Sequence, residues 1–264
     1  MDESKRYALM METLAELKPE IEAAKSAQRT QPVPALPSLS EVLTEFGPLP
    51  PEAMFMGVAF DGLPVMLNLH DPVPGPLLIT GDAGTGKTTV LQTIAIAAQM
   101  MHQPKQLQFG VVTNHPDEWN GLEEIPNNIG IFPFSHQSAE DFILSLASWA
   151  HENKSSNQIV LLLIDDLEAV AKFNPDAKQN LRWLLFRGPA RRVWPIITLN
   201  PNRMENAEPW LEAFHTRIYG PIQNIHIARH MDAENADLDS LNIGTQFVLR
   251  EGEHWLRFWL PSII

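Results

Sequence analysis

The sequence predicts an α/β fold in which a mainly parallel sheet carries helices on both faces. Strands and helices alternate from residue 76 onward, which is the pattern of a parallel sheet with crossover helices. Ile159–Ile164 is an apolar run of six residues, typical of a strand buried on both faces. A glycine-rich loop, Gly81–Thr88, separates an apolar strand from the start of a helix.

Composition narrows the class of protein. The 264 residues suffice for one large domain with appendages, and a hydrophobic fraction of 44% indicates a buried core. No apolar run reaches membrane length and the N-terminus is charged, so we expect no membrane insertion. The absence of cysteine excludes disulfides and thiolate metal sites and fits a cytoplasmic location. The net charge of −13 argues against a surface that coats DNA, but allows a local basic lining.

Two segments are predicted to precede the main domain. Residues 1–30 are expected to form a helix that docks on a neighbouring subunit or packs on its own domain. Its apolar stripe is Met10, Leu14, Leu17 and Ile21. Residues 31–53 are rich in proline and are expected to be a linker, with one helical turn at Ser38–Phe46.

Residues 54–264 are the predicted phosphate-loop domain. It opens with a β-hairpin, because Asp61-Gly62 separates two apolar runs, Met54–Phe60 and Leu63–Leu69. Asn174-Pro175 supplies an N-cap followed by a proline in the first helical turn. We expect strands at 77–80, 107–113, 159–164, 194–199 and 216–219, helices at 87–102, 139–152, 175–188 and 207–214, and a closing pair of strands at 245–249 and 255–260.

The loop Gly81–Thr88 fits the Walker A pattern G-x-x-x-x-G-K-[ST]. Its glycines let backbone N–H groups surround a phosphate, and the following helix directs its positive end at the same anion. Lys87 can reach the β- and γ-phosphates, and Thr88 can place its hydroxyl on Mg²⁺. A glycine turn that binds nothing is the alternative. The predicted nucleotide-binding residues are Gly81, Asp82, Ala83, Gly84, Thr85, Gly86, Lys87, Thr88 and Thr89.

Carboxylates follow the apolar run directly, where α/β sheets bind their ligands. Asp165 is the predicted partner of Thr88 at the metal. Asp166 is the predicted residue that orients or activates the attacking water, with Glu168 as second choice. The alternative is that these acids are only solvent-exposed charges at the end of a strand.

Two further positions are candidates near the phosphates. Asn200, directly after a strand, is predicted to contact the γ-phosphate, with Thr198 second, although Asn200-Pro201 can also be a simple turn. In ring ATPases an arginine from the next subunit stabilises charge on the transferring phosphate, and Arg191 or Arg192 could do so. For any single arginine a surface charge is the simpler interpretation.

Segments outside the loop resemble the FtsK/SpoIIIE/HerA group of ring motor ATPases, including the repeats of type VII secretion ATPases. The resemblance runs from about residue 35 to residue 262. It implies a RecA-like P-loop fold and a homo-oligomeric, hexameric ring. It also implies hydrolysis of ATP to ADP and phosphate with Mg²⁺, and movement of a polymer through the central hole of the ring. The segments that carry it are Met56–Val65, Gly121–Pro126 with Ile129–Phe132, Thr216–Ile218 and Leu238–Leu249.

One residue departs from this family, because Asp166 stands where its hydrolytic motors usually carry glutamate. The shorter side chain implies slow hydrolysis, or binding without turnover. We therefore expect a DNA translocase or packaging ATPase, with DNA in the channel of the ring. The alternatives are a secretion ATPase that acts on protein, and an ATP-binding assembly protein with weak hydrolysis. The charge of −13 and the Asp-Asp pair favour the alternatives, whereas the arginines and Thr216–Ile218 favour DNA.

Overall fold

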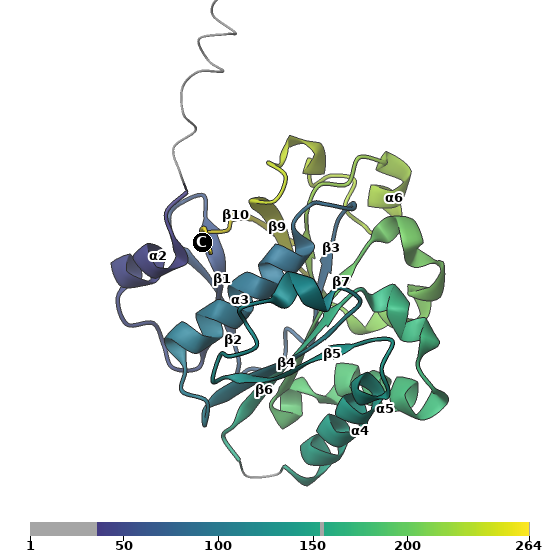
Figure 1. The fold of residues 1–264 in the computed structure, drawn as a ribbon. Coiled ribbons are helices and arrows are strands. Elements are labelled where there is room, and N and C mark those ends of the chain that lie inside the picture. The colour runs from purple at the N-terminus through teal and green to yellow at the C-terminus, as the bar shows by residue number, and fades with distance from the viewer. Residues whose placement is uncertain (1–35, 154–155, 264) are drawn as a thin grey trace, which may run out of the picture. The chain divides into compact units, whose positions relative to one another are not determined.

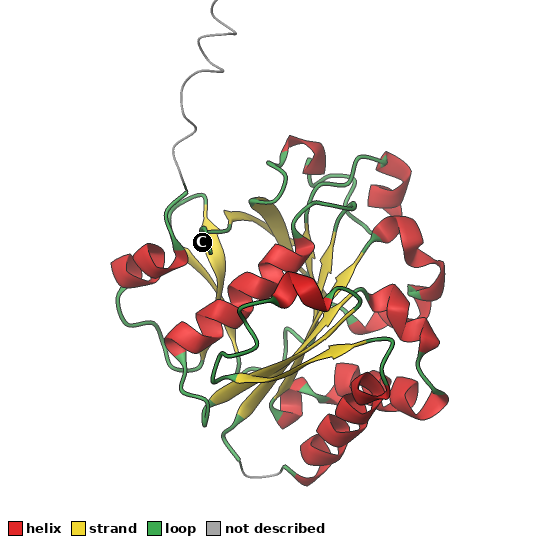
Figure 2. Cartoon of the chain, viewed as in Figure 1, coloured by secondary structure: helices red, strands yellow, loops and turns green. Residues whose placement is uncertain are grey.

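The computed structural model describes residues 36–153 and 156–263, so the helix expected within residues 1–30 lies outside the described residues. Residues 38–264 form one compact unit. Its centre is a ten-stranded sheet (Figures 1 and 2). The strands are β1 (Ala53–Ala59), β2 (Pro64–Asn68), β3 (Leu77–Thr80), β4 (Leu107–Thr113), β5 (Asn128–Pro133), β6 (Ile159–Asp165), β7 (Val193–Leu199), β8 (Thr216–Tyr219), β9 (Gln246–Glu251) and β10 (His254–Trp259).

The strands pair in the order β2-β1-β10-β9-β8-β3-β7-β6-β4-β5. All pairs from β8 to β5 are parallel, and β3 lies between β7 and β8. The carboxyl ends of these strands therefore meet at one edge of the sheet, with the end of β3 in the middle. This arrangement confirms the predicted α/β fold with a mainly parallel sheet.

Helices cover both faces of the parallel strands (Figure 1). Strand β6 shows why, because its buried side chains alternate between two cores. Leu161 and Leu163 pack in the core that contains α3 (Lys87–Met101). Leu162 and Ile164 pack in the core that contains α4 (Gln137–Glu152) and α5 (Pro175–Arg187). No helix of the described residues has both the length and the apolar character needed to cross a bilayer.

The other half of the sheet is antiparallel. Strands β1 and β2 form the predicted hairpin, and β9 and β10 form the closing pair. The two hairpins join through β1 and β10, where Val58 pairs with Trp259 and Ala59 with Phe258. The N-terminal hairpin is thus an extension of the sheet.

Helix α2 (Leu39–Phe46) precedes the first hairpin and lies where one helical turn was expected. Its eight residues begin with a capping box, in which Ser38 Oγ accepts from Glu41 N at 3.2 Å and Glu41 Oε2 accepts from Ser38 N at 2.8 Å. Leu39 and Val42 are buried in the core that contains α3. The division of the chain at residues 30 and 53 stays a prediction.

The structure corrects the expected helix at 207–214. That region contains two short 3₁₀ helices, η4 (Pro201–Asn206) and η5 (Glu208–Ala213). Each has a proline in its first turn, and proline lacks the N–H that would continue α-helical hydrogen bonding from the preceding residues. Strand β5, at the edge of the sheet, and α6 (Ile225–His230) were not predicted.

Candidate functional site

The loop 81–86 connects the end of β3 to the start of α3 at the centre of the strand edge. Gly84 and Gly86 have φ values of 74° and 88°, in the left-handed region that favours glycine. Gly86 is the N-cap of α3 and provides no side-chain acceptor, so the first N–H groups of the helix remain available to an anion. A Cβ on Gly86 would lie 2.7 Å from Gly244 Cα. The loop has the shape of a phosphate cradle.

Lys87 lies across this loop. Its Nζ donates hydrogen bonds to the carbonyl oxygens of Gly81 at 2.9 Å and Asp82 at 2.8 Å. Burial lowers the pKa of Lys87, and the carboxylates of Asp166 and Asp165 act in the opposite direction. A partly desolvated ammonium group at the start of a helix is suited to bind phosphate oxygens.

Thr88 and Asp165, which the sequence assigns to a metal, are in contact. Thr88 Oγ1 donates to Asp165 Oδ2 at 2.9 Å, and Thr198 Oγ1 donates to Asp165 Oδ1 at 2.8 Å. Burial raises the pKa of Asp165, while the hydrogen bonds from Thr198 and Thr88 lower it. A hydroxyl and a carboxylate beside a phosphate cradle fit Mg²⁺, which prefers oxygen ligands.

Asp166, the predicted water-activating residue, has an unusual backbone. Its φ of 87° and ψ of 85° are sparsely populated by residues other than glycine. Its N–H donates to Thr198 Oγ1 at 2.8 Å, its carbonyl oxygen accepts from Ala169 N at 3.1 Å, and Asn114 Nδ2 donates weakly to its carboxylate at 3.5 Å. The side chain is half-buried and lies next to the residues that would hold the metal.

Glu168, the second choice, has a different environment. Both of its carboxylate oxygens are buried and have no hydrogen-bond partner among the described residues. The ion pair with Arg203 Nη1 is long, at 3.9 Å. Burial raises the pKa of Glu168. A carboxylate with a raised pKa is a stronger base than an ordinary glutamate, which suits it to accept a proton.

Asn200 lies at the carboxyl end of β7, at the same edge as the loop. Its Oδ1 accepts from Asn202 N at 3.1 Å, which caps η4. The side chain that reaches the phosphate loop is that of Asn202, whose Nδ2 donates to Asp82 Oδ1 at 2.8 Å. The other carboxylate oxygen of Asp82 accepts from Gln223 N at 2.8 Å. Asp82 therefore connects the phosphate loop to the loops after β7 and β8.

Arg191 and Arg192 lie at the other end of β7, directly before its first residue, Val193. A strand of seven residues is about 23 Å long, so neither guanidinium reaches the phosphate loop of its own chain. A role at the phosphate of a neighbouring subunit stays a prediction.

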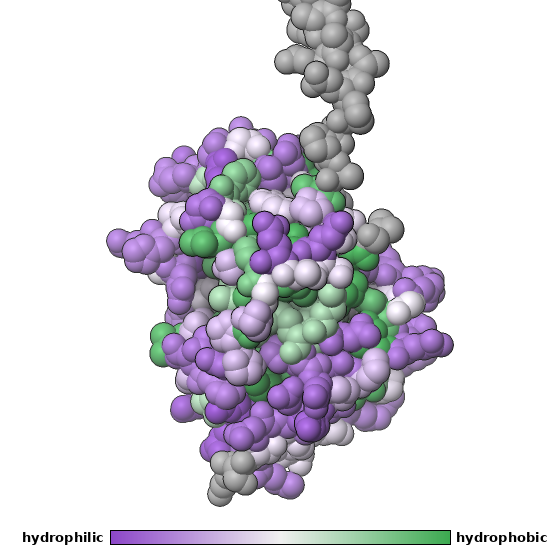
Figure 3. Space-filling view, turned by 90° about the vertical axis from the view of Figure 1, so that its left-hand side faces the viewer, coloured by the Kyte–Doolittle hydropathy of each residue, from purple (hydrophilic) through white to green (hydrophobic). Residues whose placement is uncertain are grey.

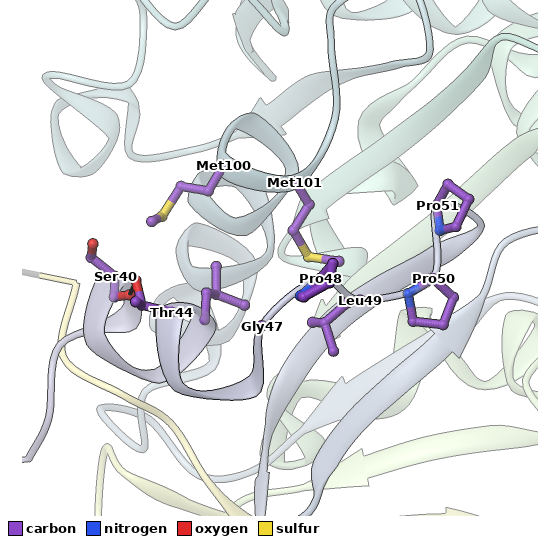
Figure 4. A pocket seen from close by; sticks show the side chains of 10 residues that line it. Ser40, Thr44, Gly47, Pro48, Leu49, Pro50, Pro51, Met100 and Met101 are labelled. Carbon is purple, nitrogen blue, oxygen red and sulfur yellow. Dashed lines mark hydrogen bonds between the residues drawn. The ribbon is translucent and has the colours of Figure 1, made fainter.

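A cavity of about 410 Å³ with a mixed apolar and uncharged polar lining lies away from this site (Figure 4). It is bounded by α2, the end of α3 and the segment after α2, with Leu43, Leu49, Met100 and Met101 among its lining. Figure 3 shows apolar residues at the centre of the face on the α2 side. The lining contains no charged side chain, and the length of α3, about 22 Å, separates it from Lys87.

The model of the NACHT domain matches residues 75–228, more than half of the chain. The chain belongs to the NACHT family. It is therefore a P-loop NTPase domain, the class that the Walker A pattern predicted. The motifs outside the loop did not predict this family. No curated protein matches the NACHT chain by sequence.

Solved structures of FtsK/SpoIIIE-type ATPases share the fold, which confirms that resemblance at the level of architecture. EssC (ATPases 2 and 3) from Geobacillus thermodenitrificans is 16% identical, with a TM-score of 0.68 over 88% of this chain and 48% of that chain. EccC (ATPases 2 and 3) from Thermomonospora curvata, in complex with a signal sequence peptide, is 14% identical, with a TM-score of 0.64 over 86% and 43%. The NACHT chain spans about half the length of these two structures.

A third structure of the same fold is the pCW3 conjugation coupling protein TcpA, as a monomer with ATPγS. It is 14% identical, with a TM-score of 0.64 over 89% of this chain and 71% of that chain. At these identities the likeness concerns the fold alone.

The structure thus brings the predicted residues 81–89, 165, 166, 198 and 200 to one edge of the sheet, and leaves Arg191 and Arg192 at the other. Sequence reasoning missed Asn202, Gln223 and Gly244. Asn202 is two residues from the chosen asparagine, but no spacing rule tells which of two asparagines in a turn faces the loop. Gly244 is about 160 residues from the loop in sequence, and only the fold shows that it touches Gly86.

Proposed function

We propose that the chain binds ATP with Mg²⁺ and hydrolyses it to ADP and phosphate. The observation that carries the proposal is the contact of Thr88 and Asp165 beside the glycine cradle. The loop and helix start at residues 81–89 would hold the nucleotide, with Lys87 on the β- and γ-phosphates. Thr88 and Asp165 would hold the metal. When bound, Mg²⁺ supplies positive charge that offsets the charge of the phosphates.

A carboxylate is needed to orient the attacking water and to accept its proton. We assign this role to Asp166, because Thr198 fixes its backbone next to the metal ligands. Glu168 is the second candidate, because its buried carboxylate has a raised pKa and no hydrogen-bond partner among the described residues. Substitution of each by the neutral amide separates the two.

Asn200 is proposed to contact the γ-phosphate from the end of β7. Arg191 or Arg192 is proposed to stabilise the phosphate bound to an adjacent subunit, which requires a homo-oligomeric ring. Their position at the other end of β7 keeps them away from the loop of the same chain, so a contact with a bound phosphate would have to be made in a neighbouring subunit. We propose a hexamer, as in the ring motors that the sequence resembles.

The work that we propose for the ring is translocation or packaging of DNA through its channel. Support comes from the resemblance of Thr216–Ile218 to the translocases, and from the fold shared with a conjugation coupling protein. A protein substrate is the second candidate. It is favoured by the net charge of −13 and by the fold shared with a protein solved in complex with a signal sequence peptide.

The experiment is the rate of phosphate release from ATP by the purified protein, with and without linear duplex DNA, over a range of salt concentrations. Stimulation at low salt that weakens as salt rises supports the DNA motor. ATP turnover without any stimulation by DNA removes that proposal and leaves the protein substrate. Tight ATP binding without turnover would identify an ATP-binding assembly protein instead. Lys87→Ala protein serves as the blank in every arm.

A further inference from the structure

Thr198 lies on the strand that separates the phosphate loop from the two acids of the site. Strand β7 runs between β3, which precedes the loop, and β6, which ends in Asp165 (Figure 1). Thr198 is the residue before the last in β7, pairs with Ile79 in β3, and is fully buried. Because threonine is branched at Cβ, few rotamers are available to it in a strand, and the direction of its hydroxyl is restricted.

The hydroxyl group of Thr198 contacts both acids. The N–H of Asp166 donates to Thr198 Oγ1 at 2.8 Å, and Thr198 Oγ1 donates to Asp165 Oδ1 at 2.8 Å. A backbone N–H can only donate, so the hydroxyl accepts on the side of Asp166 and directs its single proton at the Asp165 carboxylate. The two acids are therefore joined through one oxygen atom in the interior of the sheet.

At Asp165 the hydroxyl distinguishes the two carboxylate oxygens. Oδ1 accepts from Thr198, whereas Oδ2 accepts at 2.9 Å from Thr88 Oγ1, the residue that is proposed to share the metal. The rotation of an aspartate carboxylate about its last bond is only weakly restricted by its own rotamer preference. Two donors, one on each oxygen, therefore fix the plane of the carboxylate, and one donor alone would leave it free to turn.

At Asp166 the same hydroxyl holds an unfavourable backbone in place. A residue other than glycine with a φ of 87° and a ψ of 85° persists only where its surroundings fix it. The carbonyl oxygen accepts from Ala169 N in the next turn, and among the described residues the carboxylate has one hydrogen bond, a long one from Asn114 at 3.5 Å. The direction of the carboxylate therefore depends on the backbone, and the backbone N–H is anchored by Thr198.

We propose that Thr198 is a positioning residue for the hydrolysis of ATP, and that one hydroxyl fixes both the metal-binding carboxylate and the water-orienting residue. The inference rests on the proposed ATPase and adds a residue to it. Thr198 is fully buried and its hydroxyl is bonded on both sides within the protein, so it acts through Asp165 and Asp166 and does not contact the nucleotide. Removal of this one hydroxyl should impair metal-dependent binding and turnover together.

Three variants of the full chain test this role. Thr198→Val keeps the shape of the side chain and removes the hydroxyl, whereas Thr198→Ser keeps the hydroxyl and removes the methyl group. A residue that only packs tolerates valine better than serine, and a positioning residue shows the reverse order in kcat. Thr80→Val is the matched control, because Thr80 is also fully buried, ends the neighbouring strand β3, and its Oγ1 has no hydrogen-bond partner among the described residues.

Nucleotide-free protein gives a readout that does not depend on ATP turnover. Amide hydrogen exchange of Asp166, followed by NMR, reports whether its N–H is held. We expect exchange at least about tenfold faster in Thr198→Val than in the parent, because the hydrogen bond that protects this N–H is lost. Thr198→Ser and Thr80→Val should exchange at the parental rate. An unchanged rate in Thr198→Val would overturn the proposal, since the hydroxyl would then not hold this backbone.

Turnover and metal dependence are measured on the same variants. Thr198→Val should lower kcat by at least about tenfold, because the water-orienting carboxylate is no longer held. It should also reduce the gain in affinity for ATPγS that Mg²⁺ gives over EDTA, and leave the affinity in EDTA unchanged. Thr198→Ser should restore both values. In an Asp166→Asn background, Thr198→Val should lower kcat little further and should still reduce the Mg²⁺ effect, because only the latter depends on Asp165.

Parental kcat and a parental Mg²⁺ effect in Thr198→Val, with serine tolerated less well than valine, would reduce Thr198 to a packing residue and reject the proposal. That failure is distinct from failure of the proposed ATPase, in which the parent protein itself would neither hydrolyse ATP nor bind ATPγS more tightly with Mg²⁺.

Discussion

Asn202 donates a hydrogen bond from its Nδ2 to Oδ1 of Asp82 at 2.8 Å, and so links the loop after β7 to the phosphate loop. Asp82 Oδ2 accepts from Gln223 N at 2.8 Å, which adds the loop after β8. One carboxylate therefore holds the phosphate loop and both neighbouring loops together. Asn200, two residues from Asn202, would then contact the nucleotide while Asn202 positions the loop.

Asn202→Ala should weaken nucleotide binding by roughly tenfold, because a hydrogen bond to a charged group contributes about 1.5 kcal/mol. Fluorescent nucleotide titration measures this. Asn200→Ala should lower kcat more than it lowers affinity, since that side chain is proposed to contact the γ-phosphate. Equal effects of both variants on affinity alone would contradict the division of roles.

Lys87→Ala should weaken binding of nucleoside triphosphate by about a hundredfold or more, because it removes a charged donor to the β- and γ-phosphates. Titration calorimetry with a non-hydrolysable ATP analogue measures this. Lys105→Ala is the control, since Lys105 is exposed in the turn after α3. Retained tight binding in Lys87→Ala protein would show that the loop does not hold the phosphates as proposed.

Asp166→Asn should reduce kcat by about 10²- to 10⁴-fold without weakening nucleotide binding, if Asp166 accepts the proton of the attacking water. Glu168→Gln should then have a small effect. The reverse result would assign the role to Glu168, whose pKa is raised by burial. Phosphate release under single-turnover conditions distinguishes these cases.

Binding of metal and nucleotide should depend on the ionisation of Asp165. Burial raises the pKa of this carboxyl above 3.8, and metal binding requires the ionised form. As pH falls, Mg²⁺-dependent binding should therefore be lost at a higher pH than an ordinary aspartate would cause. Nucleotide titrations in Mg²⁺ and in EDTA across acidic pH measure the difference, and an Mg²⁺ effect that persists below pH 3.8 would count against the assignment.

The same pKa shift predicts a gain in stability from Asp165→Asn. A raised native pKa means that the folded chain binds more protons than the unfolded chain between the two pKa values, so the free energy of unfolding decreases as pH rises through them. In the absence of nucleotide, the variant should unfold at a higher temperature than the parent near neutral pH. The difference should shrink as pH approaches the unfolded value of 3.8.

The parallel part of the fold could be predicted from sequence because its strands are short apolar runs, which are typical of buried strands. Ile159–Asp165 must be buried on both faces, and a phosphate loop after β3 fixes the direction of the neighbouring strands. Strand β5 was missed because Asn128 and Gly130 disfavour a strand, and only pairing with β4 stabilises it. The region 207–214 was misassigned because its apolar residues suggested an α-helix, whereas a proline in its first turn leaves only a short 3₁₀ helix.

Sequence located the site residues most accurately where a motif specifies both the residue type and its position. Lys87 and Thr88 follow from the loop, and Asp165 follows from the end of a buried strand. The tether from Asn202 to Asp82 depends on which side chain of a turn faces the loop, and sequence does not encode that locally. The distance of Arg191 and Arg192 from the phosphate loop of their own chain is visible only in the fold, because it depends on the direction of β7.

The contact between β1 and β10 has a consequence for how the chain folds. Val58 and Trp259 are separated by about 200 residues, so this pairing has a very high contact order and forms late. Until β10 pairs with β1, the β1–β2 hairpin presents the unpaired edge of β1 in addition to that of β2. Proteolytic loss of the last strand would expose edges on both β1 and β9, and exposed edges promote aggregation. Strand β10 thus covers two sheet edges that would otherwise be open to pairing with another chain.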